Sequence, residues 1–291
     1  MLPICRQSLD FTIYALRPSD AFPIANTPPR ARGEVRLSSK HRDGLSVIGD
    51  LRQSGSLKAL FPNVHDQGLQ AVLVNTAGGI TGGDHFSVEA RAGAETTLTL
   101  TTQAAERAYQ TQSGQTGEIK TRLTVESGAR LVWVPQETIL FDGCALQRRL
   151  TMKMESSARL LFAEPVVFGR AAMGERLTHG LFRDRVELCR DGATFFLDAT
   201  QLKDDIAQQL AKPAVANAAG AMVLLVYVAP DAGTQLAHLR TLLPETAGAS
   251  VIGDDLLIMR ALAADSYELR QTLVPILTHL TGDALPRPWM I

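Results

Sequence analysis

Apolar and polar positions alternate along most of the chain between about residues 31 and 196. In the segment 119–126, for example, apolar residues and a threonine occupy the odd positions from Ile119 to Val125, and mainly charged residues occupy the even ones. A period of two is that of a β-strand with one buried face. Glycine-containing pairs separate such segments as turns do, at 92–93, 127–128, 142–143 and 191–192. The pattern predicts a mainly β fold, with a body of many short strands over residues 34–200.

Beyond residue 200 the spacing of apolar residues changes. Residues 202–212 are predicted to form a short helix that Pro213 ends. A strand–helix–strand–helix unit follows, with its four elements at 222–228, 234–243, 256–262 and 265–280. Asp265 stands at the N-cap position of the last helix, with Glu268 three residues on, and Pro275 is expected to kink that helix.

The domain organisation that follows from these patterns has three parts. Residues 1–33, with four prolines between positions 18 and 29, are predicted to be an irregular N-terminal lead-in. Residues 34–200 form the β-rich body, and residues 201–291 form an α+β C-terminal subdomain with two main helices. No composition shift marks a linker between the last two parts. We therefore expect the subdomain to pack on the body as one structural unit.

Composition and charge bear mainly on the kind of partner and the compartment to expect. The 291 residues are 45% hydrophobic and carry a formal net charge of −1, which gives no electrostatic reason to expect nucleic acid or an anionic membrane as partner. The longest apolar run, residues 221–229, is far shorter than the ~20 residues of a membrane span. The N-terminus lacks the apolar stretch of a secretory signal. Three widely spaced cysteines, Cys5, Cys144 and Cys189, suggest the reducing cytoplasm.

The segment 72–84 holds four glycines within six positions, directly after an apolar run. Such glycines let backbone N–H groups approach an anion, but a phosphate-binding P-loop would end in Gly-Lys-Ser or Gly-Lys-Thr, and Asp84 stands there instead. A structural tight turn is therefore the favoured interpretation, and nucleotide binding is disfavoured. The segment 100–109, with Gln103, Glu106 and Arg107, fits a sheet edge better than a functional polar surface.

Acidic residues embedded in apolar sequence are the main candidates for chemistry. Glu137, Asp142, Glu164 and Glu175 are of this kind, and their burial would be costly without a partner. One interpretation is that they pair with arginines, and those at 148, 149 and 170 are available. The alternative is that the carboxylates line a water-filled internal passage. Carboxylate oxygens can bind a divalent ion transiently, although they do not select nickel.

Self-sufficient metal and catalytic motifs are missing from the sequence. The six histidines form no HxH or HExxH group, no cysteine pairs with one, and no GxSxG elbow is present. Asp84 and His85 are the nearest thing to a local ligand pair, which is more often a solvated turn. A permanent metal site made by this chain alone has little support.

Six segments, taken together and in order, resemble one known family. They are 53–62 (QSGSLK followed by LFP), 75–84 (NTAGGITGGD), 100–109 (LTTQAAERAY), 135–142 (PQETILFD), 168–175 (FGRAAMGE) and 285–289 (LPRPW). Each alone is weakly diagnostic, but the ordered set is specific. The chain resembles the urease accessory protein D family, called H in some bacteria, from about residue 31 to residue 289.

The resemblance implies a cytosolic, non-catalytic chaperone. It would bind apo-urease and accessory protein F, which recruits the GTPase accessory protein G, and together they would promote nickel insertion and lysine carbamylation in urease. The family fold is an irregular β-helix-like body with two main helices near the C-terminus. The family is also associated with an internal passage thought to conduct nickel. By this resemblance the tunnel-lining residues would be Asp84, Glu137, Asp142, Glu164 and Glu175.

The expected cargo is therefore Ni²⁺ in transit, with no permanently bound cofactor. A second hypothesis is a purely structural adaptor that orients accessory proteins F and G on urease, with no direct nickel handling. A third is an enzyme or nucleotide-binding protein that uses the glycine-rich segment.

Overall fold

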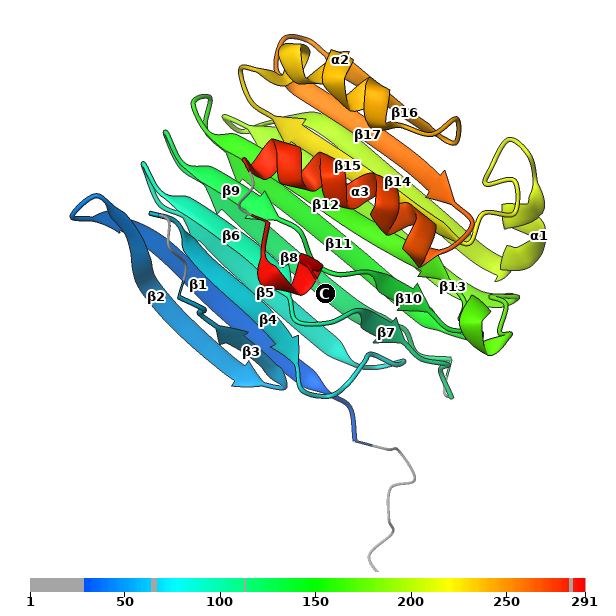
Figure 1. Cartoon of the computed structure of the whole chain (residues 1–291). Coiled ribbons are helices and arrows are strands. Elements are labelled where there is room, and N and C mark those ends of the chain that lie inside the picture. Colours follow the sequence, from blue (N-terminus) through cyan, green and yellow to red (C-terminus); the bar gives the residue numbers. More distant parts are fainter. Residues whose placement is uncertain (1–28, 64–66, 113, 283–284, 291) are drawn as a thin grey trace, which may run out of the picture.

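Two large β-sheets face each other and form the body of the protein (Figure 1). The computed structural model describes residues 29–63, 67–112, 114–282 and 285–290. Most of the predicted lead-in, residues 1–28, lies outside this range, so the expectation that it is irregular stays a prediction. The chain joins the first sheet at Arg32.

The first sheet, sheet A, contains seven strands. Its order is β14-β13-β11-β8-β5-β1-β2. In chain order these are β1 (Arg32–Arg42), β2 (Leu45–Gly55), β5 (His85–Ala92), β8 (Gly117–Val125), β11 (Ala145–Met154), β13 (His179–Arg190) and β14 (Ala193–Asp205).

The second sheet, sheet B, has ten strands, eight of which follow the order β16-β17-β15-β12-β9-β6-β4-β3. In chain order these are β3 (Leu57–Leu60), β4 (Leu69–Asn75), β6 (Thr97–Thr102), β9 (Arg130–Trp133), β12 (Arg159–Phe168), β15 (Ala221–Val228), β16 (Ala247–Ile252) and β17 (Leu256–Ala263). Two short strands, β7 (Glu106–Ala108) and β10 (Thr138–Leu140), pair with each other and join the sheet through β12.

The chain winds between the two sheets in a β-solenoid-like path. In sheet A, β5, β8, β11 and β13 are parallel neighbours. In sheet B, β4, β6, β9 and β12 are parallel neighbours as well. The chain passes alternately from one set to the other, so each turn adds a strand to both sheets. The mainly β, β-helix-like fold expected from the resemblance is confirmed.

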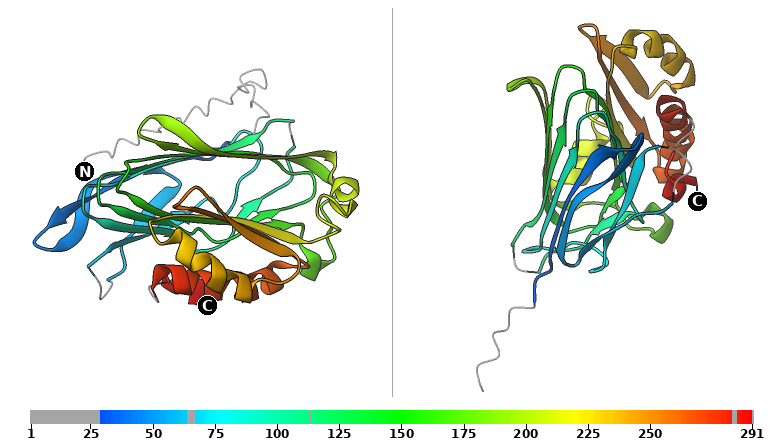
Figure 2. Two further views of the ribbon diagram at one scale, coloured as in Figure 1. Left: turned by 90° about the horizontal axis from the view of Figure 1, so that it is seen from above. Right: turned by 90° about the vertical axis from the view of Figure 1, so that its left-hand side faces the viewer.

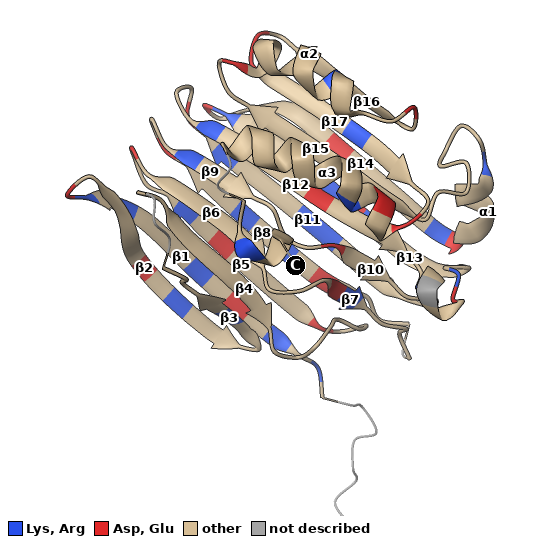
Figure 3. Cartoon of the chain, in the orientation of Figure 1, with Lys and Arg blue, Asp and Glu red and all other residues tan. Residues whose placement is uncertain are grey.

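The alternation in the sequence corresponds to the two faces of sheet A. In β8, Thr121, Leu123 and Val125 are buried, while Lys120 and Arg122 are exposed. The buried faces of both sheets enclose one hydrophobic core. Acidic and basic residues lie interspersed along the strands (Figure 3).

A helical layer covers the outer face of sheet B, on the side away from sheet A (Figure 2). It contains α2 (Ala232–Leu242) and α3 (Ser266–Thr281), and Leu269, Leu273 and Leu277 of α3 are buried in a second hydrophobic core. Because β12 is covered on both faces, nine of its ten residues are buried and its sequence does not alternate. The two main C-terminal helices were predicted correctly.

The start of α3 also agrees with the prediction. The Asp265 side chain accepts a hydrogen bond from Glu268 N at 2.9 Å, and the Glu268 carboxylate accepts one from Ala264 N at 2.8 Å. The helix continues past Pro275 to Thr281.

Two predictions for the C-terminal part were wrong. Strand β14 extends to Asp205, so the predicted helix 202–212 shrinks to α1 (Ile206–Ala211). The tail is a strand–helix–strand–strand–helix unit, because β16 pairs with β17. Its first four residues, Ala-Gly-Ala-Ser, carry no apolar pattern, and pairing with β17 determines their conformation. Among the described helices, none has both the length and the apolar character needed to cross a membrane.

Candidate functional site

A cavity of about 260 Å³ lies between the two sheets. Phe86 and Ile119 of sheet A and Trp133 of sheet B form part of its apolar wall. Exposed residues Gln103 and Arg107 line it towards the surface. Its polar lining includes four side chains that can carry chemistry, namely Glu106, Gln136, Arg148 and Glu164.

Arg148 holds two carboxylates together at the buried end of this cavity. Its Nη2 atom lies 3.2 Å from Glu164 Oε2 and forms a second ion pair with Asp184 Oδ2. Its Nη1 donates to Thr138 Oγ1 at 3.0 Å. Arg148 and Asp184 are register partners on β11 and β13 of sheet A, whereas Glu164 belongs to β12 of sheet B. The cluster therefore bridges the two sheets through the core.

The charges of this cluster do not cancel. Two carboxylates face one guanidinium, and both Arg148 and Glu164 are buried. Burial raises the pKa of Glu164, although the Arg148 charge and the hydrogen bond from Trp133 Nε1, at 2.8 Å, act against this shift. Since a buried charge is costly without compensation, a second negative charge here favours an added proton, the direction in which burial moves the Glu164 pKa.

Glu106 is the second cavity carboxylate. It lies on β7 and accepts hydrogen bonds from Asn75 Nδ2 at 3.0 Å and from its neighbour Arg107 N at 3.0 Å. Burial raises its pKa by more than these hydrogen bonds lower it. The sequence of this segment favours a sheet edge, and only the fold brings Glu106 to the cavity.

Asp84 has a structural position at the end of the glycine-rich turn. Its two carboxylate oxygens accept hydrogen bonds from Ala31 N at 2.7 Å and from Thr81 N at 2.8 Å. In the same turn Gly78 and Gly83 have positive φ angles of 77° and 87°, which glycine adopts without strain. The prediction of a structural tight turn is confirmed. His85 next to it pairs with Glu118 instead, at 3.5 Å.

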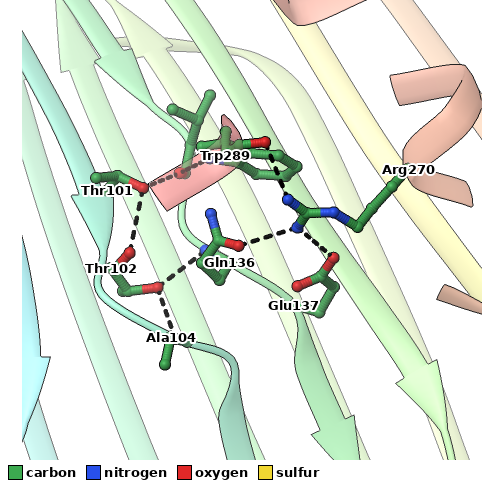
Figure 4. Close-up of polar contacts among 8 residues, drawn as sticks. Thr101, Thr102, Ala104, Gln136, Glu137, Arg270 and Trp289 are labelled. Carbon is green, nitrogen blue, oxygen red and sulfur yellow. Dashed lines mark hydrogen bonds and ion pairs between the residues drawn. The ribbon is translucent and has the colours of Figure 1, made fainter. Parts of the chain in front are cut away.

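Glu137 pairs with α3 rather than with the cavity (Figure 4). Arg270 Nη1 donates to Glu137 Oε1 at 2.9 Å and to Gln136 Oε1 at 3.0 Å, and its Nη2 donates to the carbonyl oxygen of Trp289 at 3.1 Å. Trp289 Nε1 in turn donates to Val134 O at 2.8 Å. One guanidinium thus ties the helical layer and the C-terminal turn to sheet B.

Asp142 and Glu175 lie together at the turn before β11. Asp142 Oδ1 accepts from Thr178 N, from the Thr178 hydroxyl and from His179 N, at 2.7, 2.7 and 2.8 Å. Burial alone would raise the pKa of Asp142, but these hydrogen bonds outweigh it and lower the pKa. Glu175 accepts from Asp142 N at 2.8 Å and pairs with Arg170.

The structure thus separates the five sequence-predicted residues. Glu164 lines the cavity, and Asp142 and Glu175 meet at the turn before β11. Glu137 pairs with α3, and Asp84 lies at the end of the glycine-rich turn. The metal role of all five residues stays a prediction. The expectation that arginines pair with such carboxylates is confirmed for Arg148 and Arg170. The sequence did not single out Asp184, because it is one of many charged residues in its strand. Its pairing with Arg148 follows from the register of β11 and β13, which the sequence does not show.

In the parts of the chain that the structure describes, no group of three or more histidine, cysteine, aspartate or glutamate side chains is arranged to hold a metal ion. The fold and the cavity define a protein with a β-solenoid-like body whose interior contains an arginine-bridged pair of carboxylates.

Comparison with known proteins identifies the family of this chain. The family model described as UreD urease accessory protein matches residues 31–290. A urease accessory protein UreD from Ruegeria pomeroyi is 54% identical over 88% of this chain and 100% of its own length. Proteins of the same name from Roseobacter denitrificans and Rhizobium etli are 51% and 40% identical, over 90% and 91% of this chain and 96% and 97% of their own lengths. The chain belongs to the UreD family of urease accessory proteins, and its role is in urease maturation.

Proposed function

We propose that this chain is a non-catalytic, cytoplasmic chaperone of nickel insertion. It binds apo-urease together with accessory proteins F and G, and nickel crosses the chain through the cavity between its two sheets. The single observation that carries this proposal is the cavity itself, which extends from exposed residues near Arg107 to the buried carboxylate of Glu164.

The chemistry of the cavity lining supports passage of a hydrated ion. An apolar cavity of this size stays dry, whereas a polar one holds water that bridges its polar groups. Gln136 is 7% exposed, its Nε2 has no hydrogen-bond partner among the described residues, and it lines this cavity. Carboxylate oxygens from Glu106 and Glu164 add weak ligands for a divalent cation. Weak, successive ligands suit an ion in transit better than an ion in storage.

A purely structural adaptor is the second candidate, and the contacts of the other acidic residues favour it. Asp84, Glu137, Asp142 and Glu175 are all engaged in turns or ion pairs that hold elements together. On this hypothesis the chain orients its partners on urease, and nickel reaches the active site by another route.

Glu106→Gln distinguishes the two candidates. The variant removes a cavity charge while keeping the size of the side chain and a hydrogen-bond acceptor. We expect urease matured with this variant to contain severalfold less nickel, while urease and accessory protein F still co-purify with it in normal amounts. Glu118→Gln, at an ion pair outside this cavity, is the matched control. Normal nickel content with Glu106→Gln would favour the adaptor.

A further inference from the structure

The outer face of sheet A carries far more basic than acidic side chains over its middle strands, β8, β11 and β13. The helical layer lies on sheet B, and no described helix covers these three strands from outside (Figure 2). Along each strand, the side chains that alternate with the buried ones point outward. Six basic and two acidic side chains face outward there, although the whole chain has a net charge of −1. They are Lys120, Arg122, Arg149, Lys153, Arg183 and Arg185, with Glu118 and Glu187.

Strand register places three of these basic residues side by side. Lys120 on β8 is the register partner of Arg149 on β11, and Arg149 is in turn the partner of Arg185 on β13. Neighbouring strands are ~4.8 Å apart, so three positive charges form a row across the sheet. Like charges that lie opposite each other on adjacent strands are unfavourable. The isolated chain therefore carries a charge arrangement that costs it stability.

The two ends of this row have acidic partners, and its centre has none. Lys120 Nζ lies 2.6 Å from Glu118 Oε2. Arg185 Nη2 lies 3.2 Å from Glu187 Oε2. Arg149 is exposed, and its side chain makes no ion pair or hydrogen bond with any other described residue. Its planar guanidinium is therefore available to bind a carboxylate from outside in a two-pronged contact.

The mixture of side chains on this face favours a protein as its partner. Glu118 and Glu187 would repel the continuous phosphates of a nucleic acid. The outward positions of these three fully described strands also hold no phenylalanine, tyrosine or tryptophan on which a base could stack. A protein surface can place separate carboxylates opposite separate basic residues and avoid the acidic ones. Urease is the protein whose maturation this family serves, so we take apo-urease as the partner.

We propose that the outer face of sheet A, centred on Arg149, is the surface on which an acidic surface of apo-urease docks. The inference rests on the proposed function and deepens it, because it assigns the binding of apo-urease to one face of the chain. Carboxylates of the partner neutralise the row of Lys120, Arg149 and Arg185. Docking thereby removes a repulsion that the isolated chain has to bear.

Reversing the charge of the row tests this proposal. The full-length triple variant Lys120→Glu, Arg149→Glu, Arg185→Glu is co-expressed with the urease subunits and accessory protein F. We expect at least about tenfold less urease to co-purify with it than with the wild-type chain, because like charges then face each other across the interface. Accessory protein F is expected to co-purify in normal amounts.

A second triple variant is the matched control. Arg42→Glu, Arg176→Glu and Lys212→Glu reverse three exposed basic residues that lie outside β8, β11 and β13. This variant has the same net charge as the first and is expected to retain urease. Urease recovered in wild-type amounts with the folded row variant, or lost equally with both variants, would overturn the proposal. Loss of accessory protein F instead of urease would overturn it too, as would capture of nucleic acid by the wild-type row.

Should the reversed row prevent folding as judged by circular dichroism, glutamine at the same three positions decides. The neutral variant is expected to be at least as stable to heat as the wild-type chain, because the repulsion is gone. Its remaining capture of urease should depend less on NaCl concentration, since fewer charges are screened. Urease capture with the wild-type amount and salt dependence would overturn the proposal.

The amount of captured urease is a different readout from the nickel content of urease. Normal nickel content with Glu106→Gln would reject the route through the cavity and leave the docking face standing. Nickel-poor urease with Glu106→Gln, together with normal urease capture by the reversed row, would keep the route and reject the docking face.

Discussion

At the scale of single residues, arginines determine how the buried carboxylates behave. Arg148, Arg170 and Arg270 each bind a carboxylate that the sequence places within or beside apolar residues. The need for such partners was predictable, because a buried unpaired charge is costly. The identity of the partner was predictable only where arginine and acid are close in sequence, as for Arg170 and Glu175. Arg270 is more than a hundred residues from Glu137, and only the packing of α3 on sheet B brings them together.

Removing Arg270 is expected to be costly for stability. Arg270→Ala leaves Glu137, which is 7% exposed, without its cation, and also removes contacts to Gln136 and Trp289. We expect the free energy of unfolding to fall by about 2 to 4 kcal/mol in urea denaturation. Arg149→Ala is the control, since Arg149 is exposed on β11 with no ion pair among the described residues, and should change stability by at most about 0.5 kcal/mol. Equal effects of the two substitutions would contradict this account.

At the scale of elements, the features that the sequence predicted correctly are those that depend on residues close together in the chain. The alternation in β8 and the cap of α3 are properties of a few neighbouring residues, and both were predicted. Strand β16 and the end of β14 were mispredicted because their pairing partners determine them. The place of Glu106 at the cavity was not predicted for a related reason: its segment is a short strand, β7, whose position depends on β10.

The cap of α3 gives a test at this scale. Asp265→Ala removes the acceptor for Glu268 N, and we expect a loss of about 1 kcal/mol in the free energy of unfolding. Asp254→Ala is the control, because it removes an exposed aspartate in the turn before β17 that caps no helix. Thermal unfolding compares the two variants. A cap variant as stable as the turn variant would show that packing alone positions this helix.

At the scale of the whole molecule, the two-sheet path creates the features on which function is proposed. The cavity and the cluster of Arg148 with its two carboxylates lie between sheets A and B, and the cavity is lined by residues as distant in sequence as Gly78 and Glu164. Periodicity indicated which side chains of the alternating strands face inward, but it contains no information on which strands face each other. The resemblance supplied the β-helix-like winding. Glu164 and Arg148 were already candidates in the sequence, as an acid in an apolar run and an arginine available to pair, and only the strand register brought Asp184 to Arg148.

On the proposed function, nickel reaches urease through the cavity between the sheets. Ile119→Trp tests it most directly, because Ile119 lines the cavity on β8 and a tryptophan there would fill part of its volume. Leu197→Trp adds the same bulk at a side chain that is 52% exposed on β14. The measurement is the nickel content of urease co-expressed with each variant, normalised to the amount of complex that co-purifies. We predict that Ile119→Trp yields nickel-poor urease from complexes that form normally, and that Leu197→Trp yields full loading. Full nickel content with a folded Ile119→Trp variant would contradict the claim.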